Sequence, residues 1–199
     1  MNRFSREINM RVLPALVFAT TLAAAPAWAQ TPPDPAARVA RQQAAMKALS
    51  WMDGVWRGPA VTTRPGGVKV TITQTERSGP LLGGAVHVVE GRGYNADGST
   101  GFNALGIISY DPDKDAYSMR SYAMGQAGDF PLTLTPNGAI WTIAAGPATI
   151  RYTITAKDGA WHEVGERVVE GQAPVQFFEM TLKRIGDSSW PAAGAIPPN

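Results

Sequence analysis

The chain has 199 residues, of which 44% are hydrophobic, and it contains no cysteine. This length suits a single domain that buries a core without disulfide bonds, and the missing cysteines exclude a thiol nucleophile, a thiolate metal site and a lipidated cysteine. The 18 Lys and Arg residues against 16 Asp and Glu residues give a net charge of +2, which is too small for the positive field that nucleic acid requires.

The first 29 residues predict a secretory signal peptide. A basic segment comes first, at Arg3, Arg6 and Arg11. A mostly apolar run over residues 12–25 follows, and Ala27-Trp28-Ala29 has the small-x-small pattern that a signal peptidase recognises. A membrane anchor is the alternative, but the run is shorter than the roughly 20 apolar residues that span a bilayer. We therefore expect a periplasmic or secreted mature chain from Gln30, with 15 basic and 15 acidic residues, no stable membrane span and no nucleic-acid partner.

A leader and one amphipathic helix are predicted within residues 30–53. Asp34 suits the N-cap position, and Pro35 suits the first helical position because proline has no N–H to lose there. Apolar residues at helical spacing form a stripe over residues 36–50: Val39, Met46 and Leu49. We expect this stripe to pack across the open seam or mouth of the domain, with a membrane-surface or partner helix as the alternative.

From Val55 onward the hydrophobic pattern changes to a period of two, which is typical of strands. Nine segments rich in Gly, Pro, Asn and Asp, among them Ser78-Gly79-Pro80, predict turns and hence about ten strands. No helix-length segment interrupts them, so parallel crossovers are excluded. We expect an all-β, antiparallel up-and-down barrel over residues 54–186, with an immunoglobulin-like sandwich as the alternative, and a disordered tail over residues 187–199.

Three motifs occur in the order found in a known family. They are Leu49-Ser50-Trp51-Met52-Asp53-Gly54-Val55-Trp56-Arg57-Gly58, Ile107-Ile108-Ser109-Tyr110-Asp111-Pro112-Asp113-Lys114-Asp115-Ala116-Tyr117 and Phe178-Glu179-Met180-Thr181-Leu182-Lys183-Arg184. Together they resemble the bacterial family of exported proteins called domain of unknown function 1579, which is grouped with the lipocalin-like calycin barrels. The resemblance covers roughly residues 45–185 and implies a calycin barrel, but it implies no substrate and no catalytic residues.

Four residues are predicted to be structural: Trp56, Arg184, Gly54 and Gly58. In lipocalin-like barrels a first-strand Trp between glycines closes one end. On the last strand, the alternating apolar face that includes Phe178 ends at Arg184 and is expected to point inward. The resemblance implies that Arg184 stacks on Trp56 and hydrogen-bonds nearby carbonyl groups.

The candidate ligand site consists of polar and aromatic residues expected to line a cavity: His162, Glu166, Tyr152, Phe178, Arg120 and Tyr122. If Val164 and Val168 point inward, His162 and Glu166 share their face and lie about 13 Å apart. The alternative is that both are solvated and Trp161 is the core residue. The direction of Arg120 and Tyr122 stays open, and His87 is expected to face solvent.

These patterns favour a binding barrel for a small hydrophobic or amphipathic molecule, because no recognised catalytic motif is present. Residues 111–115 read Asp-x-Asp-x-Asp but lack the glycine and glutamate of a calcium loop, so they predict a plain turn. No cofactor and no metal are expected. The alternatives are a cavity enzyme, an isomerase or hydrolase that uses His162 or Glu166 as general acid–base, a haem-binding barrel with one His ligand, and a partner-binding or envelope-structural role.

Overall fold

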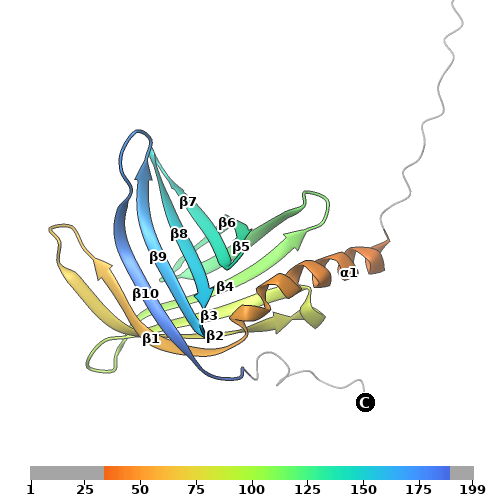
Figure 1. Ribbon diagram of the computed structural model, residues 1–199, viewed down its shortest axis with the longest axis horizontal. Helices are drawn as coiled ribbons and strands as arrows, with labels where there is room; N and C mark the ends of the chain where they lie inside the picture. The colour runs from red at the N-terminus through yellow and green to blue at the C-terminus, as the bar shows by residue number, and fades with distance from the viewer. Residues whose placement is uncertain (1–33, 189–199) are drawn as a thin grey trace, which may run out of the picture. The chain divides into compact units, whose positions relative to one another are not determined.

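The computed structural model describes residues 34–188, in which ten antiparallel strands close into one barrel (Figure 1). In chain order the strands are β1 (Gly54–Thr63), β2 (Lys69–Leu81), β3 (Val86–Tyr94), β4 (Thr100–Asp111), β5 (Ala116–Ala123), β6 (Gln126–Thr135), β7 (Gly138–Ala145), β8 (Ala148–Lys157), β9 (Ala160–Val169) and β10 (Val175–Gly186). Each strand pairs with its sequence neighbours, and β1 closes the ring against β10. The predicted up-and-down barrel is confirmed. The predicted signal peptide and most of the predicted tail lie outside the described residues.

One predicted turn is wrong. Ser78-Gly79-Pro80 lies inside β2 and pairs with β3, and the chain turns instead through η2 (Leu82–Gly84). The backbone φ of Gly83 is +65°, a conformation that glycine adopts without strain. Pro80 is tolerated because β1 pairs with β2 only as far as Ser78, which leaves Pro80 with a strand on one side alone.

Two helical segments precede the barrel, α1 (Pro35–Met46) and η1 (Lys47–Met52). The Asp34 carboxylate caps α1 by accepting a hydrogen bond from the Ala36 N–H at 3.0 Å. Met46 and Leu49 are buried, whereas Val39 is 42% exposed, so only part of the predicted stripe packs on the barrel. Within the described part of the chain, neither segment is long and apolar enough to cross a bilayer.

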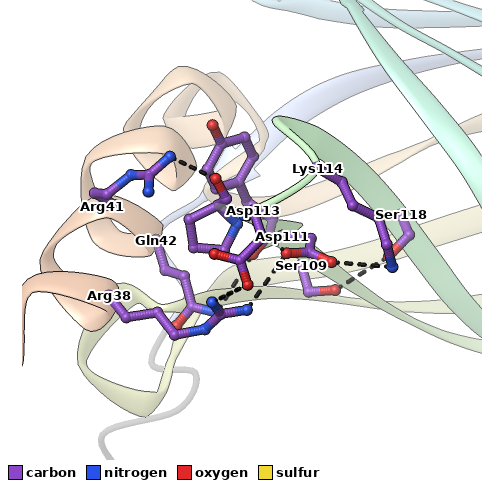
Figure 2. Close-up of polar contacts among 10 residues, drawn as sticks. Arg38, Arg41, Gln42, Ser109, Asp111, Asp113, Lys114 and Ser118 are labelled. Carbon is purple, nitrogen blue, oxygen red and sulfur yellow. Dashed lines mark hydrogen bonds and ion pairs between the residues drawn. The ribbon is translucent and has the colours of Figure 1, made fainter. Parts of the chain in front are cut away.

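Polar contacts hold α1 against the turn between β4 and β5 (Figure 2). Arg38 forms ion pairs with Asp111 and Asp113, and Arg41 donates to the carbonyl oxygen of Pro112. The Asp111 carboxylate also accepts the Asp113 N–H at 3.0 Å, as expected for an Asp-Pro turn. The acidic turn is therefore a docking point for the helix.

The apolar core lies at the end of the barrel that η1 covers, which we call the closed end. Trp56 is 3% exposed, and its indole N–H donates to the carbonyl oxygen of Met52 at 2.8 Å. Trp161 meets both Trp51 and Trp56 edge to face, with ring centroids 5.6 and 5.9 Å apart. The helical segment and the first strand thus pack around Trp161.

Close backbone approach explains the glycines around Trp56. A Cβ atom at Gly58 would lie 2.0 Å from the carbonyl oxygen of Thr181 on β10. Gly54 has a φ of +130°, and a Cβ there would lie 2.7 Å from Arg184 Nε. Arg184 donates to the carbonyl oxygen of Asp53 at 3.0 Å and pairs with Asp187. Its side chain is 41% exposed, and in the part of the chain described here it has no stacking contact with Trp56, contrary to what the resemblance implied.

Candidate functional site: the barrel cavity

A cavity of about 620 Å³ occupies the interior of the barrel. At the closed end its wall includes Met52, Ile108 and Trp161, and at the opposite end, which we call the mouth, it includes Arg64 and Asn95. Small residues are among those that line it: Gly91, Ala104, Gly106 and Gly128. At Gly91 and Gly128 the missing side chain makes room for Glu76 and for Phe130. A ten-stranded barrel is wider than an eight-stranded one. The side chains of its wall do not fill the interior, which leaves room for a ligand.

Aromatic rings form one wall of the cavity. Trp141 on β7 and Tyr152 on β8 are cross-strand partners, and their rings stack with centroids 4.1 Å apart and 7° between planes. On β10 the pairing with β9 shifts between Gln176 and Phe178. Such a bulge re-aims side chains, and here both Phe177 and Phe178 line the cavity and contact Tyr152 edge to face.

Two buried carboxyl groups face the cavity, and the first is Glu76 on β2. Glu76 is 8% exposed and accepts a hydrogen bond from the Gln74 amide at 2.8 Å. It lies over Gly91 of β3, where an added Cβ would sit 2.8 Å from each carboxyl oxygen. Burial raises the pKa of Glu76 to about 8, the Gln74 hydrogen bond lowers it, and the negative charge of Glu163 raises it further.

The second carboxyl group is Glu163 on β9, which is also 8% exposed. It accepts a hydrogen bond from the Trp141 indole N–H at 3.1 Å. The nearby Trp161 indole also lowers the pKa of Glu163. However, the buried Nε1 atom of Trp161 does not meet hydrogen-bond geometry with Glu163 or with any other described residue. Burial is the dominant effect and raises the pKa of Glu163 to about 7.

The structure brings only two of the six predicted ligand residues to the cavity, Tyr152 and Phe178. His162 and Glu166 point outward from β9, with side chains 40% and 24% exposed. There His162 pairs with Glu179, and Glu166 pairs with Arg151. The inward orientation expected for His162 and Glu166 is wrong.

Arg120 and Tyr122 also lie on the outside of the barrel. Arg120 donates to the Tyr122 hydroxyl at 2.9 Å and pairs with Asp129 on β6. Tyr122 is 44% exposed. The neighbouring residues Met119 and Ser121 line the cavity in their place.

The face of β9 that carries Trp161 points into the barrel because it packs better there than the face that carries Val164 and Val168. Burying Trp161, at 3% exposure, removes far more apolar surface from water than burying a valine would. Gly165 then faces inward, where a Cβ would lie 2.8 Å from the Tyr152 ring, so the missing side chain makes room for that ring. Glu163 falls between these two positions and is carried into the cavity. Alternation alone missed it because β9 has a glutamate on each face.

A second cleft of about 420 Å³ lies between α1 and the β2–β3 turn, with Asp53 and His87 in its wall. His87 Nε2 and Ser78 Oγ are hydrogen-bonded at 2.7 Å, and His87 Nδ1 lies 3.7 Å from Asp53 Oδ1. His87 is 2% exposed, so the solvent-facing position expected for it is wrong. Ser78, His87 and Asp53 lie in a row that resembles a catalytic triad. However, Ser78 is fully buried, so a substrate cannot reach its hydroxyl.

The barrel resembles a solved structure whose sequence is very different. The crystal structure of Rv2717c from M. tuberculosis superposes with a TM-score of 0.54 at 12% identity, over 71% of this chain and 97% of that one. Such a likeness establishes the fold alone. No family model and no curated protein matches the sequence. The expected family resemblance is therefore supported only as far as a calycin-like barrel.

Proposed function

We propose that this protein is a binding barrel that holds a small hydrophobic or amphipathic molecule in its cavity. The observation that carries the proposal is the 620 Å³ space, walled by stacked aromatic rings and containing a few buried polar groups. Apolar walls supply affinity in such sites, and isolated polar groups orient the ligand. Export of the mature chain from Gln30, and membership of the domain-of-unknown-function 1579 family, are part of the proposal and rest on the sequence motifs alone.

Two of the three alternatives from the sequence have less support from the geometry. A cavity enzyme was expected to use His162 or Glu166 as general acid–base, and both residues lie on the outer face of β9. Neither His87 nor His162 is among the residues that line the large cavity. A haem held inside the barrel would therefore have no histidine ligand, since the chain has only these two histidines.

The test is binding of Nile red, a neutral dye whose fluorescence rises in apolar surroundings. Ala104 lines the cavity on β4, whereas its neighbour Asn103 is exposed. We expect the wild-type protein and the Asn103→Trp variant to bind the dye, and Ala104→Trp to lose most binding because the indole fills the cavity. Circular dichroism spectra checked for all three proteins would establish that each is folded. Equal dye binding by both variants would place the dye on the surface and contradict the proposal.

A further inference from the structure

The buried carboxyl groups Glu76 and Glu163 have no positive partner inside the cavity. Among the described residues that line it, the single basic side chain is Arg64. Arg64 follows the end of β1 at the mouth, about 25 Å along the strand from Trp56, the cross-strand partner of Glu76. Burying an ionised carboxylate without a partner is strongly unfavourable, so the empty cavity keeps its acids partly protonated.

Nevertheless, the surroundings of Glu163 suit an ionised carboxylate. Trp141 already donates its indole N–H to Glu163. Trp161 is 3% exposed in the cavity wall, and its unpartnered N–H is a second donor that favours the charged form. An indole N–H can only donate, so these two groups stabilise negative charge. The charge of His162 also lowers the pKa of Glu163, but His162 lies on the outer face of β9 and pairs with Glu179 there. Because the cavity residues beside Glu163 supply no cation, we expect the matching charge inside the cavity to come from the ligand.

The aromatic wall suits the same kind of ligand. The stacked pair of Trp141 and Tyr152 is part of the wall on which Glu163 also lies, and Tyr152 is close enough for the charge of Glu163 to raise its pKa. Aromatic faces attract cations, by about 0.5–2 kcal/mol per contact. Rings and carboxylates together are complementary to an organic cation with an apolar body.

We propose that the cavity binds an amphipathic amine, whose ammonium group is held by Glu76 and Glu163 and whose apolar body lies against the Trp141–Tyr152 wall. This inference rests on the proposed function, because it assigns a ligand class to the same cavity. The ammonium group donates hydrogen bonds to the carboxylates and replaces the protons that they hold in the empty protein. Binding near neutral pH therefore releases protons to the solvent.

Three probes with one ring system and different head groups test the proposal: naphthylethylamine, naphthylethanol and naphthylacetic acid. Each competes with bound Nile red at about pH 7, where the amine is charged. We expect the amine to bind about 10-fold or more tightly than the alcohol, since a buried hydrogen bond to a charged group is worth at least that factor. The acid should bind most weakly, because among the described residues that line the cavity only Arg64 at the mouth could pair with its carboxylate.

Glu76→Gln and Glu163→Gln should each remove most of the preference for the amine over the alcohol, and the quantity compared is the ratio of these two affinities within each variant. Glu166→Gln on the outer face of β9 is the matched control and should behave as wild type. Titration calorimetry in phosphate and in Tris, which take up protons with different enthalpies, should give different binding enthalpies for the amine. The difference should shrink in Glu76→Gln.

The outcomes separate this inference from the proposed function. If Nile red binds but the alcohol competes as well as the amine, or the acid competes best, the cavity binds apolar molecules and the ammonium site is wrong. Failure of all three probes to displace bound dye would likewise overturn the inference. If Nile red itself does not bind, the proposed function fails as well.

Discussion

Glu76 is a buried acid whose proton should make the stability of the protein depend on pH. Its pKa is raised from 4.5 to about 8 by burial, so between these values the folded state holds a proton that the unfolded chain has lost. Stability must then fall as pH rises. His87 acts oppositely at lower pH, because burial lowers its pKa to about 4 and stability is lost as pH falls from 6.5 towards 4. The effect of the acids is therefore isolated between about pH 6.5 and 8.

We expect the free energy of unfolding to fall between pH 6.5 and 8, by up to about 1.4 kcal/mol per pH unit for each proton released. Glu76→Gln cannot release this proton, so its stability should decline less steeply than that of the wild type. Urea unfolding at several pH values measures both slopes. Glu166→Gln is the control and should keep the wild-type slope. Parallel curves for Glu76→Gln and wild type would show that Glu76 is ionised in the folded protein.

Trp56 is the second residue for which a single substitution has a definite consequence. Trp56→Ala should lower the free energy of unfolding by about 3–5 kcal/mol, because it leaves a large void beside Trp161 and removes the hydrogen bond to Met52. Arg184→Ala should cost clearly less, since that side chain is 41% exposed. Urea unfolding of the two variants compares the costs. A smaller loss for Trp56→Ala than for Arg184→Ala would contradict this account of the closed end.

Among the elements, α1 and η1 contribute differently to the structure: α1 makes polar contacts, and η1 buries apolar side chains. The polar contacts of α1 position the helix on the β4–β5 turn (Figure 2), whereas Met46, Leu49 and Met52 contribute buried apolar surface. Because the hydrophobic effect scales with the area removed from water, most of the stability from this segment comes from its last turns. Exposed ion pairs such as Arg38 with Asp113 contribute little and mainly fix where the helix lies.

Leu49 and Val39 provide a matched pair for this distinction, since both belong to the same predicted stripe. Leu49 is 0% exposed and Val39 is 42% exposed. Leu49→Ala should cost about 2–5 kcal/mol of stability, and Val39→Ala should stay within about 0.5 kcal/mol of wild type. Thermal unfolding followed by circular dichroism measures both. Similar losses for the two variants would mean that the whole stripe is buried in solution.

At the scale of the whole molecule, closure of ten strands accounts for both stability and space. Closure of β1 on β10 completes the ring of strands, although β6 and β7 pair only over Leu132–Thr135 and Gly138–Trp141. The residues that fill the barrel gather at the closed end. The remaining interior is available for a ligand. The second cleft, beside His87, is bounded by α1 and shares no lining residue with this interior cavity.

The predicted signal peptide also concerns the whole molecule. Expression of the full chain in a Gram-negative host should yield a periplasmic form whose N-terminus is Gln30, since cleavage follows Ala27-Trp28-Ala29. Mass spectrometry of the periplasmic fraction measures the mature mass. Replacing Ala29 by a bulky residue should block processing and provides the control. Recovery of the intact wild-type chain from the inner membrane would instead identify an anchor.

Local sequence patterns were sufficient to predict an all-β antiparallel domain, and they favoured a barrel over an immunoglobulin-like sandwich. Alternating strands, short turns and the absence of helix-length interruptions are local features, and they exclude most other folds before any contact is known. The same is true of the helix start at Asp34, which depends on its side chain and the backbone N–H of Ala36. The alternating pattern is obscured in Gln126–Thr135, because this segment contains Pro131 and follows a glycine-rich turn. The strand there is predicted from the number of turns and not from its own pattern.

Which residues face the cavity depends on packing between elements that are distant in the sequence. On β9 both faces combine apolar residues with a glutamate, so the choice depended on the packing of Trp161 against two other tryptophans and on the space above Gly165. His87 is buried because η1 and α1, distant in sequence, cover its strand. Glu76 and Glu163 meet the same cavity from β2 and β9, and their shared surroundings arise from barrel closure, which brings together strands that no local pattern relates.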